Sequence, residues 1–256
     1  MTKIAIIGAG RVATHLGRRM QEVGIPVSQV VSRTPAHAQV LGEALDCAWT
    51  SRWEALIPDA DWVILAVKDD AIAHVAAQLA PFARRALATH TSGATPGAVL
   101  APHFPRHGVF YPLQTFSADH TPDWDNTPVC IDAADGQDAH WLEQQAQRIS
   151  HQVFRVNDTQ RAWLHVGAVF ANNFANHCFA IAEKILSEQN LPFDLLHPLM
   201  AETLQKALSA SPAAVQTGPA VRGDQATIHR HLTMLQAHPD WKTLYEKMSE
   251  SIQKPG

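Results

Sequence analysis

The chain has 256 residues, of which 46% are hydrophobic, and a formal net charge of -4 at pH 7. This length and composition suit one large domain or two modest domains with a sizeable core, without disulfide or metal staples. The weak negative charge excludes the electrostatic footprint of a nucleic-acid or anionic-membrane partner. Three widely spaced cysteines without a C-x-x-C pair predict reduced thiols, and the histidines show no metal-ligand spacing. We therefore expect no metal.

The N-terminus lacks a basic leader, and no run of about 18 apolar residues occurs in the chain. We therefore expect a cytoplasmic protein. The first element expected is a strand at residues 4–7, because four successive apolar residues suit a strand that is buried on both faces.

The sequence GAGRVA at residues 8–13 fits the dinucleotide fingerprint G-x-G-x-x-A, at a turn from a strand into a helix. The first glycine allows the tight turn, the second admits the pyrophosphate, and the alanine lets the helix pack closely on the strand. Free N–H groups at the start of the helix then face the phosphates. The alternative is a purely structural turn. The cofactor-binding residues expected here are Gly8, Gly10, Arg11, Val12 and Ala13.

A second apolar run at residues 27–31 ends in Ser32, Arg33 and Thr34, about 20 residues beyond the glycines, where NAD enzymes carry a ribose-binding acid. No acid is present here. The hydroxyls and the guanidinium favour a 2′-phosphate, and hence NADP(H), over NAD. The alternative is an ordinary solvated arginine.

Apolar runs at residues 61–67 and 86–90 predict the next strands, whose carboxyl ends border the cofactor in an open parallel sheet. Lys68 either contacts a phosphate or is simply solvated. A nucleophilic serine is not favoured in the loop at residues 90–94, because no G-x-S-x-G elbow is present. The additional cofactor-binding residues expected at these strand ends are Ala66, Val67, Lys68, Thr91 and Ser92.

Residues 108–116 predict a strand that stops at Pro112 and exposes Tyr111 and Gln114 near the nicotinamide or substrate. Further strands are expected at residues 127–131 and 152–156, around a helix at 139–150. The alternation of strands and helices predicts an α/β fold with a Rossmann-like, doubly wound parallel sheet over residues 1–154.

From Asp158, a good N-cap, a continuous helix is predicted to about residue 189. At 100° per residue His165, Asn172 and Asn176 form a polar stripe. This stripe either faces the nicotinamide, with His165 and Asn172 as catalytic groups and Asn173 and Asn176 as substrate ligands, or forms a buried hydrogen-bonded network.

Further helices are expected at residues 195–209, 224–236 and 239–252, so that residues 155–256 form an all-α substrate and dimerisation domain. The segment between the first two, QTGPAVRGD at 216–224, is either a connector or carries Arg222 as a substrate carboxylate ligand. The long apolar helix predicts a homodimer.

The motifs GAGRVATHL, HTSGA, YPLQTFS, HVGAVFANNFANH and QTGPAVRGD occur in this order. Together they resemble an uncharacterised two-domain family with a Rossmann-like NADP-binding domain and a helical C-terminal domain of unknown function. The family is distantly similar to pyrroline-5-carboxylate reductases, deazaflavin-dependent NADP oxidoreductases and 6-phosphogluconate-dehydrogenase-like enzymes. The resemblance implies an NADP-dependent oxidoreductase. β-Hydroxyacid dehydrogenases carry a lysine and an asparagine on the comparable helix, where this chain has His165 and Asn172 and no lysine.

The sequence therefore predicts hydride transfer between NADPH and a small carbonyl or imine substrate. His165, Asn172 and Tyr111 would stabilise the polar atom of that substrate, and His165 alone has an ordinary pKa suited to proton transfer near neutral pH. The competing hypothesis is a non-catalytic NADP-binding sensor or scaffold dimer.

Overall fold

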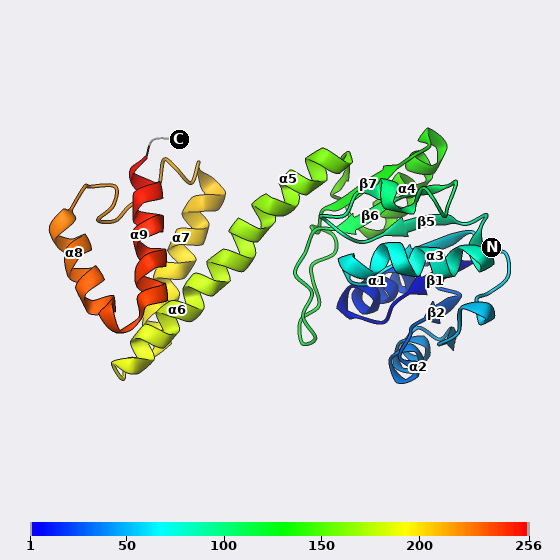
Figure 1. Ribbon diagram of the computed structural model, residues 1–256, viewed down its shortest axis with the longest axis horizontal. Helices are drawn as coiled ribbons and strands as arrows, with labels where there is room; N and C mark the ends of the chain where they lie inside the picture. The colour runs from blue at the N-terminus through cyan, green and yellow to red at the C-terminus, as the bar shows by residue number, and fades with distance from the viewer. Residues whose placement is uncertain (1, 255–256) are drawn as a thin grey trace. The chain divides into compact units, whose positions relative to one another are not determined.

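The computed structural model of the protein describes residues 2–254 (Figure 1). Its 8-stranded sheet has the order β3-β2-β1-β4-β5-β6-β7-β8. The strands are β1 (Ile4–Ile7), β2 (Gln29–Val31), β3 (Ala48–Thr50), β4 (Trp62–Leu65), β5 (Leu87–His90), β6 (His107–Pro112), β7 (Val129–Ala133) and β8 (Val153–Arg155).

In the part of the sheet with the order β3-β2-β1-β4-β5-β6, every pair of neighbouring strands is parallel, which confirms the doubly wound fold. The sheet is mixed at one place, because β7 runs antiparallel to β6. The connection between these two strands, residues 113–128, contains no helix, and a chain that returns without a crossover pairs antiparallel. β8 is again parallel to β7.

Helices cover both faces of the sheet, and the two faces carry separate apolar clusters. Alternate residues of β1 enter different clusters: Ile4 and Ile6 on one face, Ala5 and Ile7 on the other, as the period of a strand requires. The helices on the first face are α1 (Arg11–Glu22), α2 (Pro35–Ala44) and α4 (Gly136–Ile149), and α3 (Ile72–Ala83) lies on the second.

The chain divides into two compact units, residues 1–169 and 170–256. The division falls later than the expected boundary at residues 154 and 155, because helix α5 (Asp158–Ala168) bonds to the loops of the first unit. Gly97 donates its N–H to Asp158, and Arg161 donates to the carbonyl oxygen of Thr95.

The predicted long helix is present as α5, a π-helix at Val169–Phe174 and α6 (Ala175–Glu188), which follow one another directly. Its N-cap is Asn157, which forms a capping box with Gln160, and not Asp158. A π turn holds more residues than an α turn. The spacing of 100° per residue therefore does not hold between His165 and Asn176, and the predicted stripe cannot be derived from it.

The second unit is helical, with α6, α7 (His197–Ser209), α8 (Gln225–Met234) and α9 (Pro239–Gln253). Among its described residues only Ala220 and Ile228 are buried, whereas Leu199 is 63% exposed and Leu208 is 80% exposed. No helix in the described part of the chain is both long and apolar enough to cross a membrane.

Candidate functional site

The strand order reverses between β1 and β4, since β2 and β3 lie on one side of β1 and β4 to β6 on the other. In open α/β sheets, ligands bind beyond the carboxyl ends of the strands at this switch point. The residues expected to bind the cofactor follow β1, β2, β4 and β5 at this same edge.

The turn after β1 leaves no room for a side chain at Gly8 and is open at Gly10. Gly8 has a φ of +114°, and a Cβ atom there would lie 2.3 Å from the carbonyl oxygen of Ala66, so only glycine fits. A Cβ atom on Gly10 would meet nothing within 4 Å, and no side chain caps the first turn of α1. The N–H groups of Arg11, Val12 and Ala13 therefore remain available for an anion.

The residues after β2 and β4 lie at the carboxyl edge of the sheet. Arg33 and Thr34 are exposed and Ser32 is half-buried; beyond β4, Ala66 is buried against Gly8, Val67 is half-buried and Lys68 is exposed. Within residues 2–254 neither Arg33 nor Lys68 forms an ion pair. Both cations are therefore free to meet a phosphate.

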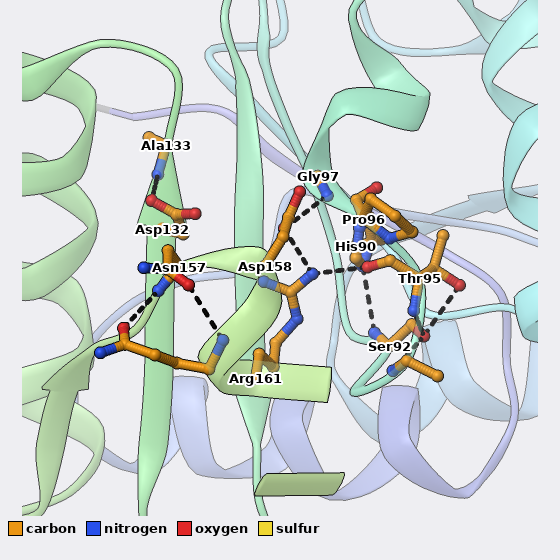
Figure 2. Close-up of polar contacts among 12 residues, drawn as sticks. His90, Ser92, Thr95, Pro96, Gly97, Asp132, Ala133, Asn157, Asp158 and Arg161 are labelled. Carbon is orange, nitrogen blue, oxygen red and sulfur yellow. Dashed lines mark hydrogen bonds and ion pairs between the residues drawn. The ribbon is translucent and has the colours of Figure 1, made fainter. Parts of the chain in front are cut away.

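The loop after β5, residues 90–97, is closed by two buried side chains (Figure 2). His90 Nδ1 accepts from the N–H of Ser92 at 3.2 Å, and its Nε2 lies 3.4 Å from the carbonyl oxygen of Pro96. Burial, and then the nearby charge of Arg161, lower the pKa of His90 to about 4. His90 is therefore neutral, with its proton on Nε2.

The Ser92 hydroxyl is used inside this loop. It accepts from the N–H groups of Ala94 and Thr95, at 3.2 and 2.9 Å, and donates to the hydroxyl of Thr95 at 3.0 Å. Thr91, by contrast, is half-buried at the rim.

Tyr111, at the end of β6, and His165, on α5, form a hydrogen-bonded pair, with 3.2 Å between the hydroxyl and Nδ1. Tyr111 is 9% exposed, so it is more buried than the sequence predicted. Burial, and then the nearby Cys130 thiol, raise its pKa to about 12. The hydroxyl therefore keeps its proton, and it can either donate to an unprotonated Nδ1 of His165 or accept from a protonated one.

Gly93 packs directly against this pair. A Cβ atom on Gly93 would lie 2.6 Å from His165 Nδ1 and 2.7 Å from Tyr111 Cζ. The absence of a side chain at Gly93 thus lets the loop after β5 meet both functional rings.

Arg161 and Asp158 were not expected in the site from the sequence. The Arg161 guanidinium donates to Asp158 at 2.7 Å and to the carbonyl oxygen of Thr95 at 2.5 Å (Figure 2). Although burial favours its neutral form, the Gly97 N–H and Arg161 hold the pKa of Asp158 below its usual value. The only sequence signal is the spacing of Asp158, Arg161 and His165, which places them on one face of a helix.

The remaining predicted site residues are exposed. Gln114 is exposed after β6, where its amide oxygen accepts from the N–H of Thr115 at 2.9 Å. Four others are exposed and belong to the second unit: Asn172, Asn173, Asn176 and Arg222.

The fold and the glycine turn are those of a dinucleotide-binding domain. Residues 3–90 match the family described as NADP oxidoreductase coenzyme F420-dependent, and residues 127–252 match a domain of unknown function, DUF2520. A candidate NADP oxidoreductase from Bacteroides fragilis is 38% identical, with 99% of this chain and 98% of that chain covered and a TM-score of 0.93. The chain therefore belongs to the family that joins this NADP oxidoreductase domain to DUF2520.

Two further structures share the fold. An imine reductase from Myxococcus stipitatus in complex with NADP+ is 14% identical, with coverage of 98% of this chain and 93% of that chain and a TM-score of 0.71. A pyrroline-5-carboxylate reductase from Coxiella burnetii is 12% identical, with 99% of both chains covered and a TM-score of 0.60. No curated protein sequence matches the chain.

Proposed function

We propose that the protein transfers a hydride between NADPH and the carbon of a small carbonyl or imine substrate. The observation that carries this proposal is the Tyr111–His165 pair, which lies against Gly93 at the same sheet edge as the glycine turn. A proton donor is required beside a hydride site because the oxygen or nitrogen of the substrate gains negative charge as its carbon is reduced.

The residues at this sheet edge fit NADPH. The open face at Gly10 and the uncapped first turn of α1 suit a pyrophosphate. Arg33 would bind the 2′-phosphate, together with the hydroxyls of Ser32 and Thr34. Lys68 is placed to add a further positive charge. When bound, NADPH supplies the hydride.

His165 supplies the proton in this proposal. Its protonated imidazole gives the Nε2 proton to the oxygen or nitrogen of the substrate, while Nδ1 stays bonded to Tyr111. The Tyr111 hydroxyl accepts from Nδ1–H before and after this transfer, because the neutral ring that remains carries its proton on Nδ1. Tyr111 thus orients the ring, and His165 moves the proton.

The test is NADPH oxidation against a panel of cyclic imines, keto acids and aldehydes. In the His165→Ala variant, turnover should fall by about 10² to 10⁴, the size of a lost general acid, with NADPH affinity unchanged. His151→Ala is the matched control, because His151 is exposed.

Two results would contradict the proposal. A His165→Ala variant with a lower melting temperature and full turnover would make the pair a structural network. NADPH binding without oxidation by any member of the panel would favour the sensor hypothesis.

We also propose that the second unit assembles with a second copy of the chain. Its helices leave large apolar side chains exposed, including Leu199, Leu204 and Leu208, and bury too few others to form a core of their own. A two-fold dimer would cover these side chains.

A further inference from the structure

Arg161 is the only residue of α5 that is fully buried, and its side chain is 1% exposed. Of the three guanidinium nitrogens, only Nη2 has hydrogen-bond partners among the described residues: the carbonyl oxygen of Thr95 and the carboxylate of Asp158. Nε and Nη1 are buried without a hydrogen-bond partner among the described residues.

This arrangement is poor for stability. A guanidinium keeps its charge when buried, and each unmatched N–H group adds an uncompensated desolvation penalty. Apolar side chains of similar volume often replace a whole buried ion pair with no loss of stability. Stability alone therefore does not explain an arginine at this position.

The partners of Arg161 provide that explanation. Asp158 accepts from the N–H of Gly97 at 2.9 Å as well as from Arg161. Arg161 and Asp158 therefore hold the loop of residues 90–97 at two points, the Thr95 carbonyl and the Gly97 amide (Figure 2). Ser92 and His90 make the rest of this loop rigid from within.

The same helix face then reaches the proposed catalytic pair. His165 lies one turn after Arg161 on α5, so both side chains point to the same side of the helix. The clasped loop carries Gly93, which touches both His165 and Tyr111. One turn of α5 thus fixes the loop, and the next turn places His165 upon it.

We propose that Arg161 is a positioning residue, which holds the loop of residues 90–97 against α5 and thereby sets the contact between His165 and Tyr111. Its consequence for turnover rests on the proposed function, but the contact itself can be tested without cofactor or substrate.

The chain offers a spectroscopic test because it has only two tyrosines. Both form a pair with a histidine: Tyr111 with His165 at 3.2 Å, and Tyr245 with His231 at 2.9 Å in the second unit. In full-length protein labelled with 3-fluorotyrosine, the two fluorine resonances are assigned with Tyr245→Phe. His165→Asn gives the displacement of the Tyr111 resonance when its histidine partner is lost.

In Arg161→Met, the Tyr111 resonance should move by at least half of the displacement seen in His165→Asn, and the Tyr245 resonance should stay in place. The variant should remain folded, with a lower melting temperature because Asp158 and the Thr95 carbonyl lose a partner, and the NADPH dissociation constant should change less than twofold. Arg106→Met is the matched control, since Arg106 also pairs with an aspartate, Asp138, but is 51% exposed. It should leave the Tyr111 resonance unmoved.

A folded Arg161→Met variant whose Tyr111 resonance coincides with that of the wild type would overturn the proposal. If Arg161→Met does not fold, Arg161→Gln decides. Glutamine keeps N–H donors, but its side chain is too short to reach Thr95 and Asp158 as Nη2 does, so a displaced Tyr111 resonance supports the proposal and an unmoved one overturns it. Failure of the NADPH oxidation assay alone would refute the proposed reaction and leave this contact standing.

Discussion

A Cβ atom added to Gly93 would lie 2.6 Å from Nδ1 of His165, closer than unbonded atoms approach. The Gly93→Ala variant should therefore push the ring away from Tyr111. We expect turnover to fall at least tenfold and the free energy of unfolding to fall by about 1 to 3 kcal/mol, with NADPH affinity nearly unchanged.

Steady-state kinetics, urea unfolding and NADPH titration check this prediction. Gly167→Ala is the control, because a Cβ atom there meets nothing within 4 Å. Alanine in a helix interior should leave turnover unchanged and stabilise the protein by up to about 1 kcal/mol. Wild-type behaviour of Gly93→Ala would show that the loop moves aside without consequence.

We expect cofactor choice to depend on Arg33, which is exposed after β2. Since no acid is present there to repel a 2′-phosphate, NADPH should bind at least about tenfold more tightly than NADH, equivalent to about 1.4 kcal/mol. Arg33→Asp should narrow or reverse this preference. Calorimetry of both cofactors measures it, and equal affinities in the wild type would remove the NADP preference.

The lowered pKa of His90 predicts that the folded protein loses stability in mild acid. Burial, and then the charge of Arg161, lower its pKa in the folded protein from 6.5 to about 4. Between these two pH values the unfolded chain binds a proton that the folded chain excludes, so the free energy of unfolding decreases as the pH falls. From pH 7 to pH 5 this contribution is about 2 kcal/mol.

Urea unfolding at both pH values measures the effect. His90→Asn retains an acceptor for the Ser92 N–H but does not titrate, so it should be less stable at pH 7 and lose less stability on acidification. If the wild type and His90→Asn lose equal stability, His90 is not the group responsible.

Assembly is checked by light scattering at micromolar concentration, which should return about twice the chain mass of 28.0 kDa. Leu204→Glu, on a helix of the second unit, should shift the protein to monomers. Val40→Glu is the control, since Val40 is 67% exposed on α2 of the first unit. A wild-type monomer would contradict the proposed dimer.

The main elements of the fold could be predicted from the sequence because buried strands and long helices leave strong patterns. The runs at residues 4–7 and 61–67 are strands, and the helix from Asp158 is continuous. The antiparallel direction of β7 could not be predicted, because it depends on how residues 113–128 return to the sheet. The π turn was missed for a similar reason, since apolar spacing does not reveal one extra residue in a turn.

The candidate site was predicted where chemistry is local. The glycine turn follows from its motif, and Tyr111 and His165 were each named from the sequence. Their contact was not foreseen, and neither were Gly93 and Arg161, because these depend on packing between segments that are distant in the chain. Arginine is almost never fully buried unless it is paired, so nothing in the composition of α5 marked Arg161 as an interior residue.

The loop of residues 90–97 also has a consequence for chemical reactivity. A histidine and a serine two positions apart suggest an activated nucleophile, yet His90 accepts from the main chain of Ser92 and the Ser92 hydroxyl donates to Thr95. Reagents that acylate activated serines need a base that takes the proton of the hydroxyl, and none is present in this loop. Although it contains a histidine and a serine, the loop therefore holds no activated serine.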